Sequence, residues 1–492
     1  MKIFASLLLL SLSAQAAVTL PAVFSDHMVL QSGKPVPVWG MADANEEVTV
    51  AIAGQKKTTK ADAKGQWSLK LDALAVAAEP QTLTIGEKTI KDVLIGEVWL
   101  GSGQSNMGLQ VQGANDYEGS KAAANVPLIR VFTESSPSAT TAQAVGKGSW
   151  VICSPEAVGH FSATLYFFGR NLYDVFKQPL GLINSSVGGT PIESWISPEA
   201  QQGSAELKPF YEALKQEAGK FDEAKAMKGY EREVAKWAEE VKMAKAAGTE
   251  VPRKPRDPLE TRKRKGDVGG LFNGKISPLI PYAIRGAIWY QGEANSVDYK
   301  APYYQSLLTL LAKDWRGRWN DEFPFAWVQL PNFTRAGEGW PIVREQMLNA
   351  LSTIPNSGMA ITIDIGDAKN IHPTNKQEVG RRLSLWALGA VYHKDVADTS
   401  GPLIDTATVK GGEFVLTFKH AKGLKAKGAL TEFEVAGADG QWQPADAKIE
   451  GETVVVSAKA VAEPKQVRYA WKDNPVATLF NGADIPASPF RK

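Results

Sequence analysis

The sequence contains a single cysteine, Cys153, among its 492 residues. One thiol cannot form an intramolecular disulfide, so the stability of the fold has to come from packing of its core. A thiol nucleophile would need a neighbouring group that lowers its pKa, and the stretch "SWVICSPEAVG" offers none. We therefore expect no chemistry from this cysteine.

The chain also lacks an excess of charge of either sign. Its 55 lysines and arginines are nearly balanced by 53 aspartates and glutamates, which gives a formal net charge of +2. So small a charge provides no field that would attract nucleic acid or an anionic membrane. The one basic run, "RKPRDPLETRKRK" at 253–265, contains prolines and acids and is typical of a solvent-exposed loop.

Long hydrophobic runs are missing too, apart from the N-terminus. There Lys2 precedes an apolar stretch at 3–12, and Ala-Gln-Ala follows at 14–16. This layout predicts a secretory signal peptide over residues 1–16, because the apolar stretch is too short to span a bilayer. We expect a mature chain that begins near Ala17, resides in the periplasm or outside the cell, and does not insert into a membrane.

Motifs for metals and nucleotides are absent from the sequence. There is no H-E-x-x-H and no histidine pair at ligand spacing, so a zinc ion would lack ligands. No phosphate loop and no G-x-G-x-x-G follows a predicted strand. The G-x-S-x-G turn of α/β-hydrolases is incomplete, because Met107 occupies its last position. The sequence thus predicts no metal and no cofactor.

The hydrophobic pattern divides the remaining chain into three parts. Residues 17–92 and 396–492 alternate short apolar runs with turn signals, which predicts a β-sandwich at each end. Between them, residues 93–395 alternate apolar runs with helical patterns, which predicts an α/β domain whose parallel sheet carries helices on both faces. An Ala-, Lys- and Glu-rich segment at about 203–265 predicts a helical insertion, and both a packing role and a role as substrate lid fit it.

Four predicted strands of the middle part end in polar or glycine-rich turns. These turns are "GSGQSN" at 101–106, "NSSVGGT" at 184–190, "YQGEANS" at 290–296 and "DIGDAKNIH" at 364–372. In an open parallel sheet, ligands bind beyond the carboxyl ends of the strands. Together the turns supply a serine, a glycine pair, amides and a histidine near carboxylates, which are the groups that acyl transfer needs.

Among the five histidines, only His372 is expected at the carboxyl end of a strand. The other four lie in the β domains, at a helix end or away from any strand: His27, His420, His393 and His160. This difference favours His372 as the partner of a serine nucleophile.

Five long motifs, in one order, cover most of the expected mature chain. They are "GEVWLGSGQSNM", "SSVGGTPIESWIS", "LFNGKISPLIPYAIRGAIWYQGEANS", "DIGDAKNIHPTNKQEVGRRL" and "VRYAWKDNPVATLFNGADIPASPF". The chain resembles the sialate O-acetylesterase family of the SGNH (GDSL-like) hydrolases in these motifs. The resemblance implies a flavodoxin-like SGNH hydrolase domain between two β-sandwich domains, no metal or organic cofactor, and removal of acetyl groups from sugars.

The resemblance also implies roles for individual residues. Ser105 would be the nucleophile, passing through an acetyl-serine intermediate, and His372 would be the general base. The oxyanion donors would be the backbone N–H groups of Ser105 and of Gly188 or Gly189, together with the side chain of Gln291.

Further polar residues are candidates for substrate binding. Asn106, Glu293 and Asn295 lie in the same turns as the implied catalytic residues. A sialate carboxylate would prefer an arginine partner, and Arg344 and Arg382 are candidates.

One position departs from the family pattern. SGNH enzymes carry an aspartate two or three residues before the histidine, where this chain has Asn370 and Lys369. Asp367 or Asp364 would have to orient His372 by another route, or a backbone carbonyl would hold it in a Ser–His dyad. Glu293 is a further candidate for the orienting carboxylate, and these alternatives remain open at this point.

The identity of the substrate is the widest question that the sequence leaves. We expect O-acetylated sialic acid, with acetylxylan or another acetylated glycan as the alternative. A non-catalytic carbohydrate-binding protein on a hydrolase scaffold is an alternative of another class, suggested by the missing aspartate. Fourteen tryptophans would suit sugar stacking, but most aromatic residues pack in cores. No pattern indicates an oligomeric state.

Overall fold

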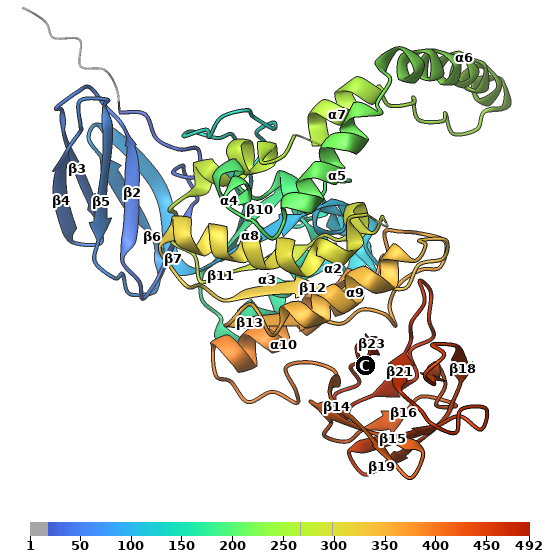
Figure 1. Ribbon diagram of the computed structural model, residues 1–492. Coiled ribbons are helices and arrows are strands. Elements are labelled where there is room, and N and C mark those ends of the chain that lie inside the picture. The colour runs from blue at the N-terminus through green and yellow to red at the C-terminus, as the bar shows by residue number, and fades with distance from the viewer. Residues whose placement is uncertain (1–17, 266, 298) are drawn as a thin grey trace, which may run out of the picture.

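The computed structural model describes residues 18–265, 267–297 and 299–492. The predicted signal peptide at 1–16 lies outside these ranges. Figure 1 shows a group of strands near the N-terminus in blue, a central body of strands and helices, and a second group of strands near the C-terminus in red. The prediction of a mixed α/β protein with a large central sheet and further β regions is confirmed.

The N-terminal group combines antiparallel strand pairs with one parallel pair, which its first and last strands form. They are β1 (Val29–Gln31), β2 (Val36–Met41), β3 (Glu47–Ile52), β4 (Gln55–Lys60), β5 (Gln66–Leu71), β6 (Ala77–Ile85) and β7 (Lys88–Gly103). Strand β2 pairs with β5, and β3 pairs with β4 and β6. Buried and less buried residues alternate along β2 and β3, because one face of each strand packs on the core.

Strand β7 belongs to both the N-terminal group and the central sheet. It pairs antiparallel with β6 and then parallel with two strands of the central sheet, β10 and β11. Every residue from Val93 to Gly103 is buried. A single continuous strand therefore connects the two regions.

The central sheet has the order β13-β12-β11-β7-β10-β8-β9. Its further strands are β8 (Ile129–Thr133), β9 (Trp150–Ile152), β10 (Leu180–Ser186), β11 (Gly286–Tyr290), β12 (Phe325–Val328) and β13 (Ser357–Ala360). All pairs from β13 to β8 are parallel, and β9 adds an antiparallel edge. The apolar runs "GAIWY" and "FAWV" are buried throughout, as expected for strands covered on both faces.

Two helix pairs cover the two faces of this sheet. The helices are α3 (Ala163–Phe176), α8 (Tyr304–Trp319), α9 (Gly339–Ala350) and α10 (Lys376–Trp386), and α3 packs on α10 while α8 packs on α9. In β11, Ile288 belongs to the apolar cluster of α3 and α10, whereas Ala287 and Trp289 belong to that of α8 and α9. Successive side chains of one strand thus anchor opposite layers.

The remaining helices are short or lie in the insertion. They are α1 (Ser105–Gly108), α2 (Tyr117–Ala122), α4 (Pro198–Gln202), α5 (Lys208–Gly219), α6 (Glu223–Ala247) and α7 (Pro258–Lys265). Short 3₁₀ or π segments occur at Val111–Gly113, Val158–His160, Ile192–Ser194, Phe272–Ile276, Ser277–Leu279, Glu293–Asn295, Ala301–Tyr303 and Ala387–Val391. Helix α6 extends away from the central body, and Ala244 is its one buried residue (Figure 1).

The C-terminal group is entirely of strands. They are β14 (Leu403–Lys410), β15 (Glu413–Lys419), β16 (Lys425–Ala426), β17 (Phe433–Ala436), β18 (Trp442–Pro444), β19 (Asp446–Glu450), β20 (Thr453–Ser457), β21 (Gln466–Tyr469), β22 (Leu479–Phe480) and β23 (Phe490–Arg491). They form the antiparallel sheets β14-β15-β20-β19, β18-β17-β21-β23 and β16-β22.

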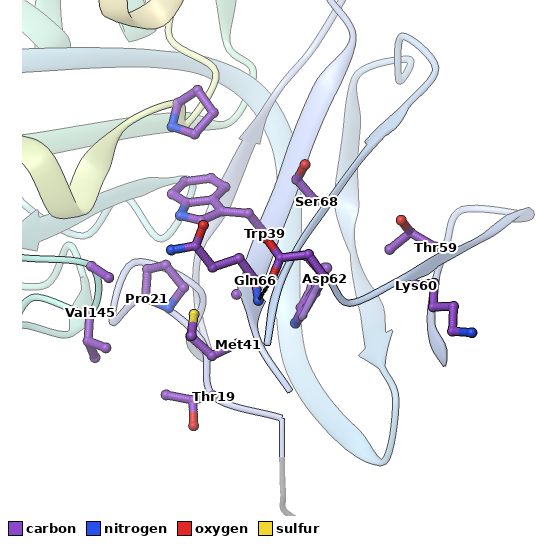
Figure 2. Close-up of a pocket in the computed structure, with 14 residues that line it drawn as sticks. Thr19, Pro21, Trp39, Met41, Thr59, Lys60, Asp62, Gln66, Ser68 and Val145 are labelled. Carbon is purple, nitrogen blue, oxygen red and sulfur yellow. Dashed lines mark hydrogen bonds between the residues drawn. The ribbon is translucent and has the colours of Figure 1, made fainter. Parts of the chain in front are cut away.

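A cavity of about 560 Å³ lies where the N-terminal strands meet the central body. Figure 2 shows Trp39 and Met41 of β2 and Gln66 of β5 along it, with Val145 from the central body at its rim. Trp39 is held in place by an edge-on contact with Phe24, with ring centroids 4.8 Å apart. The N-terminal strands and the central body, which share strand β7, are therefore separated at this point by an open cavity with aromatic residues in its lining.

Arg344 of α9 connects the central body to the C-terminal strands. The side chain is fully buried, and its guanidinium donates to the carbonyls of Leu330 and Pro331 and, beyond β21, to those of Lys472 and Asp473. A planar cation with five N–H groups suits such a cluster of carbonyl oxygens. This one side chain holds two segments that are far apart in the sequence.

The substitution Arg344→Met should strongly destabilise the protein. It removes the donor of the Leu330 and Lys472 carbonyls, whereas the carbonyls of Pro331 and Asp473 keep the N–H groups of Trp340 and Phe333. Each unsatisfied buried group costs about 1–3 kcal/mol. We expect the free energy of unfolding, measured by urea denaturation, to fall by more than about 3 kcal/mol. The matched control Arg232→Met, on the exposed face of α6, should change it by less than about 0.5 kcal/mol. Equal effects of the two changes would contradict the role of Arg344.

Candidate active site

The turn after β7 places Ser105 at the carboxyl edge of the central sheet. Gly103 has a φ of +137°, and a Cβ at this position would lie 2.1 Å from the carbonyl oxygen of Tyr290 in β11. Only glycine permits so close a contact between the two strands. The N–H of Gln104 then donates to the same carbonyl over 2.9 Å, and α1 begins at Ser105.

The glycine pair after β10 lies directly against this serine. A Cβ at Gly188 would be 3.2 Å from the Cβ of Ser105. Within the described residues, the backbone N–H groups of Ser105, Gly188 and Gly189 have no hydrogen-bond partner. These three groups are therefore available to bind an oxyanion beside the serine hydroxyl.

His372 contacts the serine from the loop between β13 and α10. Its Nε2 lies 2.8 Å from Oγ of Ser105, and its backbone N–H donates to Oδ1 of Asn370 over 2.9 Å. Burial lowers the pKa of His372, and the nearby ammonium group of Lys376 lowers it further. Both effects favour the neutral imidazole, which is the form that can accept a proton.

The two aspartates that were candidates for the third member lie elsewhere. Oδ1 and Oδ2 of Asp364 pair with Arg382 at 2.6 and 2.7 Å. Oδ1 of Asp367 accepts the N–H groups of Lys369 and Asn370 and so closes its own turn. Across the described ranges of the chain, no carboxylate has a hydrogen bond to His372. The geometry therefore contradicts Asp367 and Asp364 as orienting groups and matches a Ser–His pair.

Gln291 is fully buried, and its amide is already in use. Its Nε2 donates to Oδ1 of Asn295 over 2.7 Å and to the carbonyl of Thr190 over 3.2 Å. Its Oε1 accepts the hydroxyl of Tyr304. With both N–H groups engaged, the side chain is not an oxyanion donor as expected. It instead ties the glycine turn to the turn after β11.

The residues that we expected to bind substrate point into the protein. Asn106 and Asn295 have no exposed surface, and Glu293 is 9% exposed. Asn295 accepts the N–H of Ile192 and donates to Glu193, so it joins two loops below the surface. None of the three is exposed at the surface of the site, because a polar turn at the end of a buried strand has internal donors and acceptors of its own to satisfy.

A buried lysine that the sequence reading missed lies under the same site. Lys376, the first residue of α10, has no exposed surface, and its Nζ donates to Oδ1 of Asn106 over 2.6 Å. Burial lowers the pKa of Lys376 to about 7, against the opposing effect of Glu293. A cation in the first turn of a helix is unfavourable, because the helix dipole is positive at that end. The lysine in "TNKQE" was therefore the feature of the sequence that could have indicated an unusual environment.

Comparison with known proteins identifies the family. A model of carbohydrate esterases described as sialic acid-specific acetylesterase matches residues 274–387. Sialate O-acetylesterase from Rattus norvegicus is 28% identical over 94% of this chain and 92% of its own, and that of Homo sapiens is 27% identical over 95% and 91%. The crystal structure of a carbohydrate acetylesterase from Xanthomonas citri is 33% identical, with a TM-score of 0.81, over 97% of this chain and 99% of its own.

The chain belongs to the sialate O-acetylesterase family of carbohydrate esterases. It is therefore a carboxylic ester hydrolase, and the family predicted from the five motifs is confirmed. The alternative of a non-catalytic binding protein is not supported, because the chain belongs to a family of esterases, although the aspartate position before His372 is still occupied by Asn370.

Arg344 and Arg382 were the candidates to bind the carboxylate of a sialate substrate. Both guanidinium groups are already engaged inside the protein. Arg344 is occupied by backbone carbonyls, as described above. Arg382 is 4% exposed and pairs with Asp364 and Glu378. Neither arginine is therefore free to bind a substrate carboxylate, since both satisfy acceptors inside the protein.

The described part of this esterase contains neither a metal-binding cluster nor a membrane-spanning helix. Within 18–265, 267–297 and 299–492, no group of three or more His, Cys, Asp or Glu side chains is arranged to hold a metal ion. In the same part of the chain, no helix combines the length and apolar character needed to cross a membrane.

Substituting Gly188 tests its close contact with Ser105. In Gly188→Ala, the new methyl group at 3.2 Å from the Cβ of Ser105 should displace the serine by a few tenths of an ångström. We expect kcat/KM on a soluble acetyl ester to fall about tenfold, since small misplacements of reacting groups are costly. Gly229→Ala, in open space on α6, should leave kcat/KM unchanged. Full activity of Gly188→Ala would contradict the contact.

Proposed function

We propose that this enzyme removes O-acetyl groups from O-acetylated sialic acid, with Ser105 as nucleophile and His372 as general base. The observation that carries the proposal is the 2.8 Å contact between Oγ of Ser105 and Nε2 of His372. It lies at the carboxyl edge of the parallel sheet, in a member of a family of carbohydrate acetylesterases.

The proposed reaction has two steps. In the first, Oγ of Ser105 attacks the acetyl carbonyl while Nε2 of His372 takes the hydroxyl proton. The N–H groups of Ser105 and of Gly188 or Gly189 bind the oxyanion, and loss of one such donor typically costs about 3–4 kcal/mol. The C–O bond to the sugar then breaks, the imidazolium protonates the sugar oxygen, and acetyl-Ser105 remains.

In the second step, water attacks the acetyl-serine. His372 takes a proton from the water, and the same N–H groups bind the second oxyanion. The bond from the acetyl carbon to Oγ breaks, the proton returns to Oγ, and acetate leaves. The proposal needs no metal and no organic cofactor.

The proposal includes a layout and a location for the enzyme. We assign residues 93–395 to a flavodoxin-like SGNH hydrolase domain with an insertion at about 203–265, flanked by β-sandwich domains at 17–92 and 396–492. The parallel order of the central sheet and the antiparallel strands at both ends support this division. The N-terminal pattern at 1–16 supports export to the periplasm or the medium.

A cavity beside the active-site loop is the candidate for sugar recognition. It has a volume of about 720 Å³ and is bordered by Val187, which precedes Gly188, and by Arg256, two residues before α7. Among the described residues that border it, Arg256 is the one cation, while Asp257 and Glu260 supply carboxylates. An arginine is the preferred partner of a sialate carboxylate, whereas acetylxylan, the alternative substrate, has no charge on its xylose backbone to engage it.

Acetate release tests the chemistry. Wild-type protein and Ser105→Ala should be assayed on a generic acetyl ester, O-acetylated sialic acid and acetylated xylan. We expect the variant to lose at least about 1,000-fold in kcat, because its alanine cannot form the acyl intermediate. Wild-type protein should also become labelled at Ser105 by a serine-directed phosphonate. A variant with more than a few per cent of residual activity would refute the mechanism.

The substitution Arg256→Gln tests the choice of sugar. It should raise KM for O-acetylated sialic acid about tenfold, as expected for the loss of one charge-assisted contact. Because a neutral acetyl ester makes no such contact, its KM should stay the same and serves as the internal control. If the substitution changes the KM of neither substrate, a neutral glycan is the favoured substrate.

A further inference from the structure

A single buried side chain connects the segment of the nucleophile to the segment of the base. Asn106 directly follows Ser105, and its Nδ2 donates to the carbonyl of Ile371, directly before His372, over 3.0 Å. The backbone carbonyl of Asn106 accepts the hydroxyl of Thr164 over 3.1 Å, which anchors it to α3. The amide of Asn106 thus spans the gap between two loops that have to remain aligned.

The chemistry of its partners fixes the orientation of this amide. The ammonium of Lys376 can only donate, so the atom 2.6 Å from it must be the oxygen Oδ1. The carbonyl of Ile371 can only accept, so the nitrogen must face it. The second N–H of Nδ2 donates to Oε1 of Glu293 over 2.6 Å. A flipped amide would set donor against donor and acceptor against acceptor.

Two opposite charges are buried to keep the amide in this state. Lys376 lies on the α10 side, with Nζ 5.0 Å from the ring centroid of Tyr290, and Glu293 lies on the β11 side. Burial raises the pKa of the Glu293 carboxyl, and its Oε2 has no hydrogen-bond partner among the described residues. Burying two charged groups costs free energy of folding. Their position beneath Ser105 and His372 therefore indicates a role in function and not in stability alone.

We propose that Asn106 is the positioning residue of this active site, and that Lys376 and Glu293 hold its amide in the orientation that aligns Ser105 with His372. This inference rests on the proposed function of Ser105 and His372. It assigns to a buried Lys–Asn–Glu chain the alignment that an aspartate provides in a Ser–His–Asp triad.

The Lys–Asn–Glu chain places a positive charge, that of Lys376, near His372, whereas the aspartate of a triad places a negative charge there. The groups facing His372 are the hydroxyl of Ser105 and the ammonium of Lys376, and those facing Lys376 are Asn106, Glu293 and the ring of Tyr290. A cation near the imidazole disfavours its protonated form. The base therefore stays neutral to a lower pH than it would without Lys376.

The first test is Asn106→Asp, which keeps the shape and the acceptor for Lys376 but removes both N–H donors. We expect kcat on a generic acetyl ester to fall about 100-fold, with KM changed by less than about twofold. Asn481→Asp is the matched control, since Asn481 is an equally buried amide among the C-terminal strands. It should lose stability as well but keep its kcat, because it touches neither catalytic loop.

The second test is the pH profile of Lys376→Met, which remains informative if Asn106→Asp does not fold. Removing the cation should raise the pKa of His372, so the acidic limb of kcat/KM should move to higher pH by about one unit. A merely structural role of Lys376 would lower activity equally at every pH.

These experiments separate failure of the positioning role from failure of the proposed function. Activity of Ser105→Ala in the same assay would refute the function itself. If Ser105→Ala is inactive while folded Asn106→Asp keeps its kcat, the positioning role alone is overturned. An acidic limb of Lys376→Met that coincides with that of the wild type would overturn the role of the lysine.

Discussion

The close backbone approach between Gly103 and the carbonyl of Tyr290 is the constraint on which the rest of the site depends. Because no side chain fits between these two strands, β7 and β11 end at one level and their turns open side by side. The serine turn then follows immediately on one strand, and the turn with Gln291 and Glu293 follows on the other. Any residue larger than glycine would push the strands apart and separate the loops that carry the chemistry.

The site has a polar interior and a simple surface. In the proposed mechanism, the groups that meet the acetyl ester are one hydroxyl, one imidazole and backbone N–H groups, whereas most of the polar side chains in the four turns are buried beneath them. Asn106, Asn295, Gln291 and Glu293 form hydrogen bonds with one another or with neighbouring groups, and of Glu293 only Oε1 takes part. Such a network can hold several loops in one arrangement, because each member uses most of its donors and acceptors.

The sequence was sufficient for the sheet and for the pairing of serine with histidine, since apolar runs mark buried strands and the carboxyl ends of parallel strands meet at one edge. It was insufficient for the direction of side chains within the turns, because residue type does not tell whether an amide meets substrate or backbone. Asp367 illustrates this limit, since its carboxylate closes its own turn. Lys376 was missed for a related reason, because its burial depends on partners from two distant segments.

Because β7 is continuous, the N-terminal group of strands cannot be exchanged or removed without affecting the central sheet. The strand begins in the N-terminal group and ends two residues before Ser105, so a boundary drawn at 92 falls inside it. A truncated chain without the first group of strands would leave one end of the nucleophile's own strand without β6. The N-terminal group is therefore not an interchangeable module. Recombination with another domain would have to rebuild the strand that carries the serine.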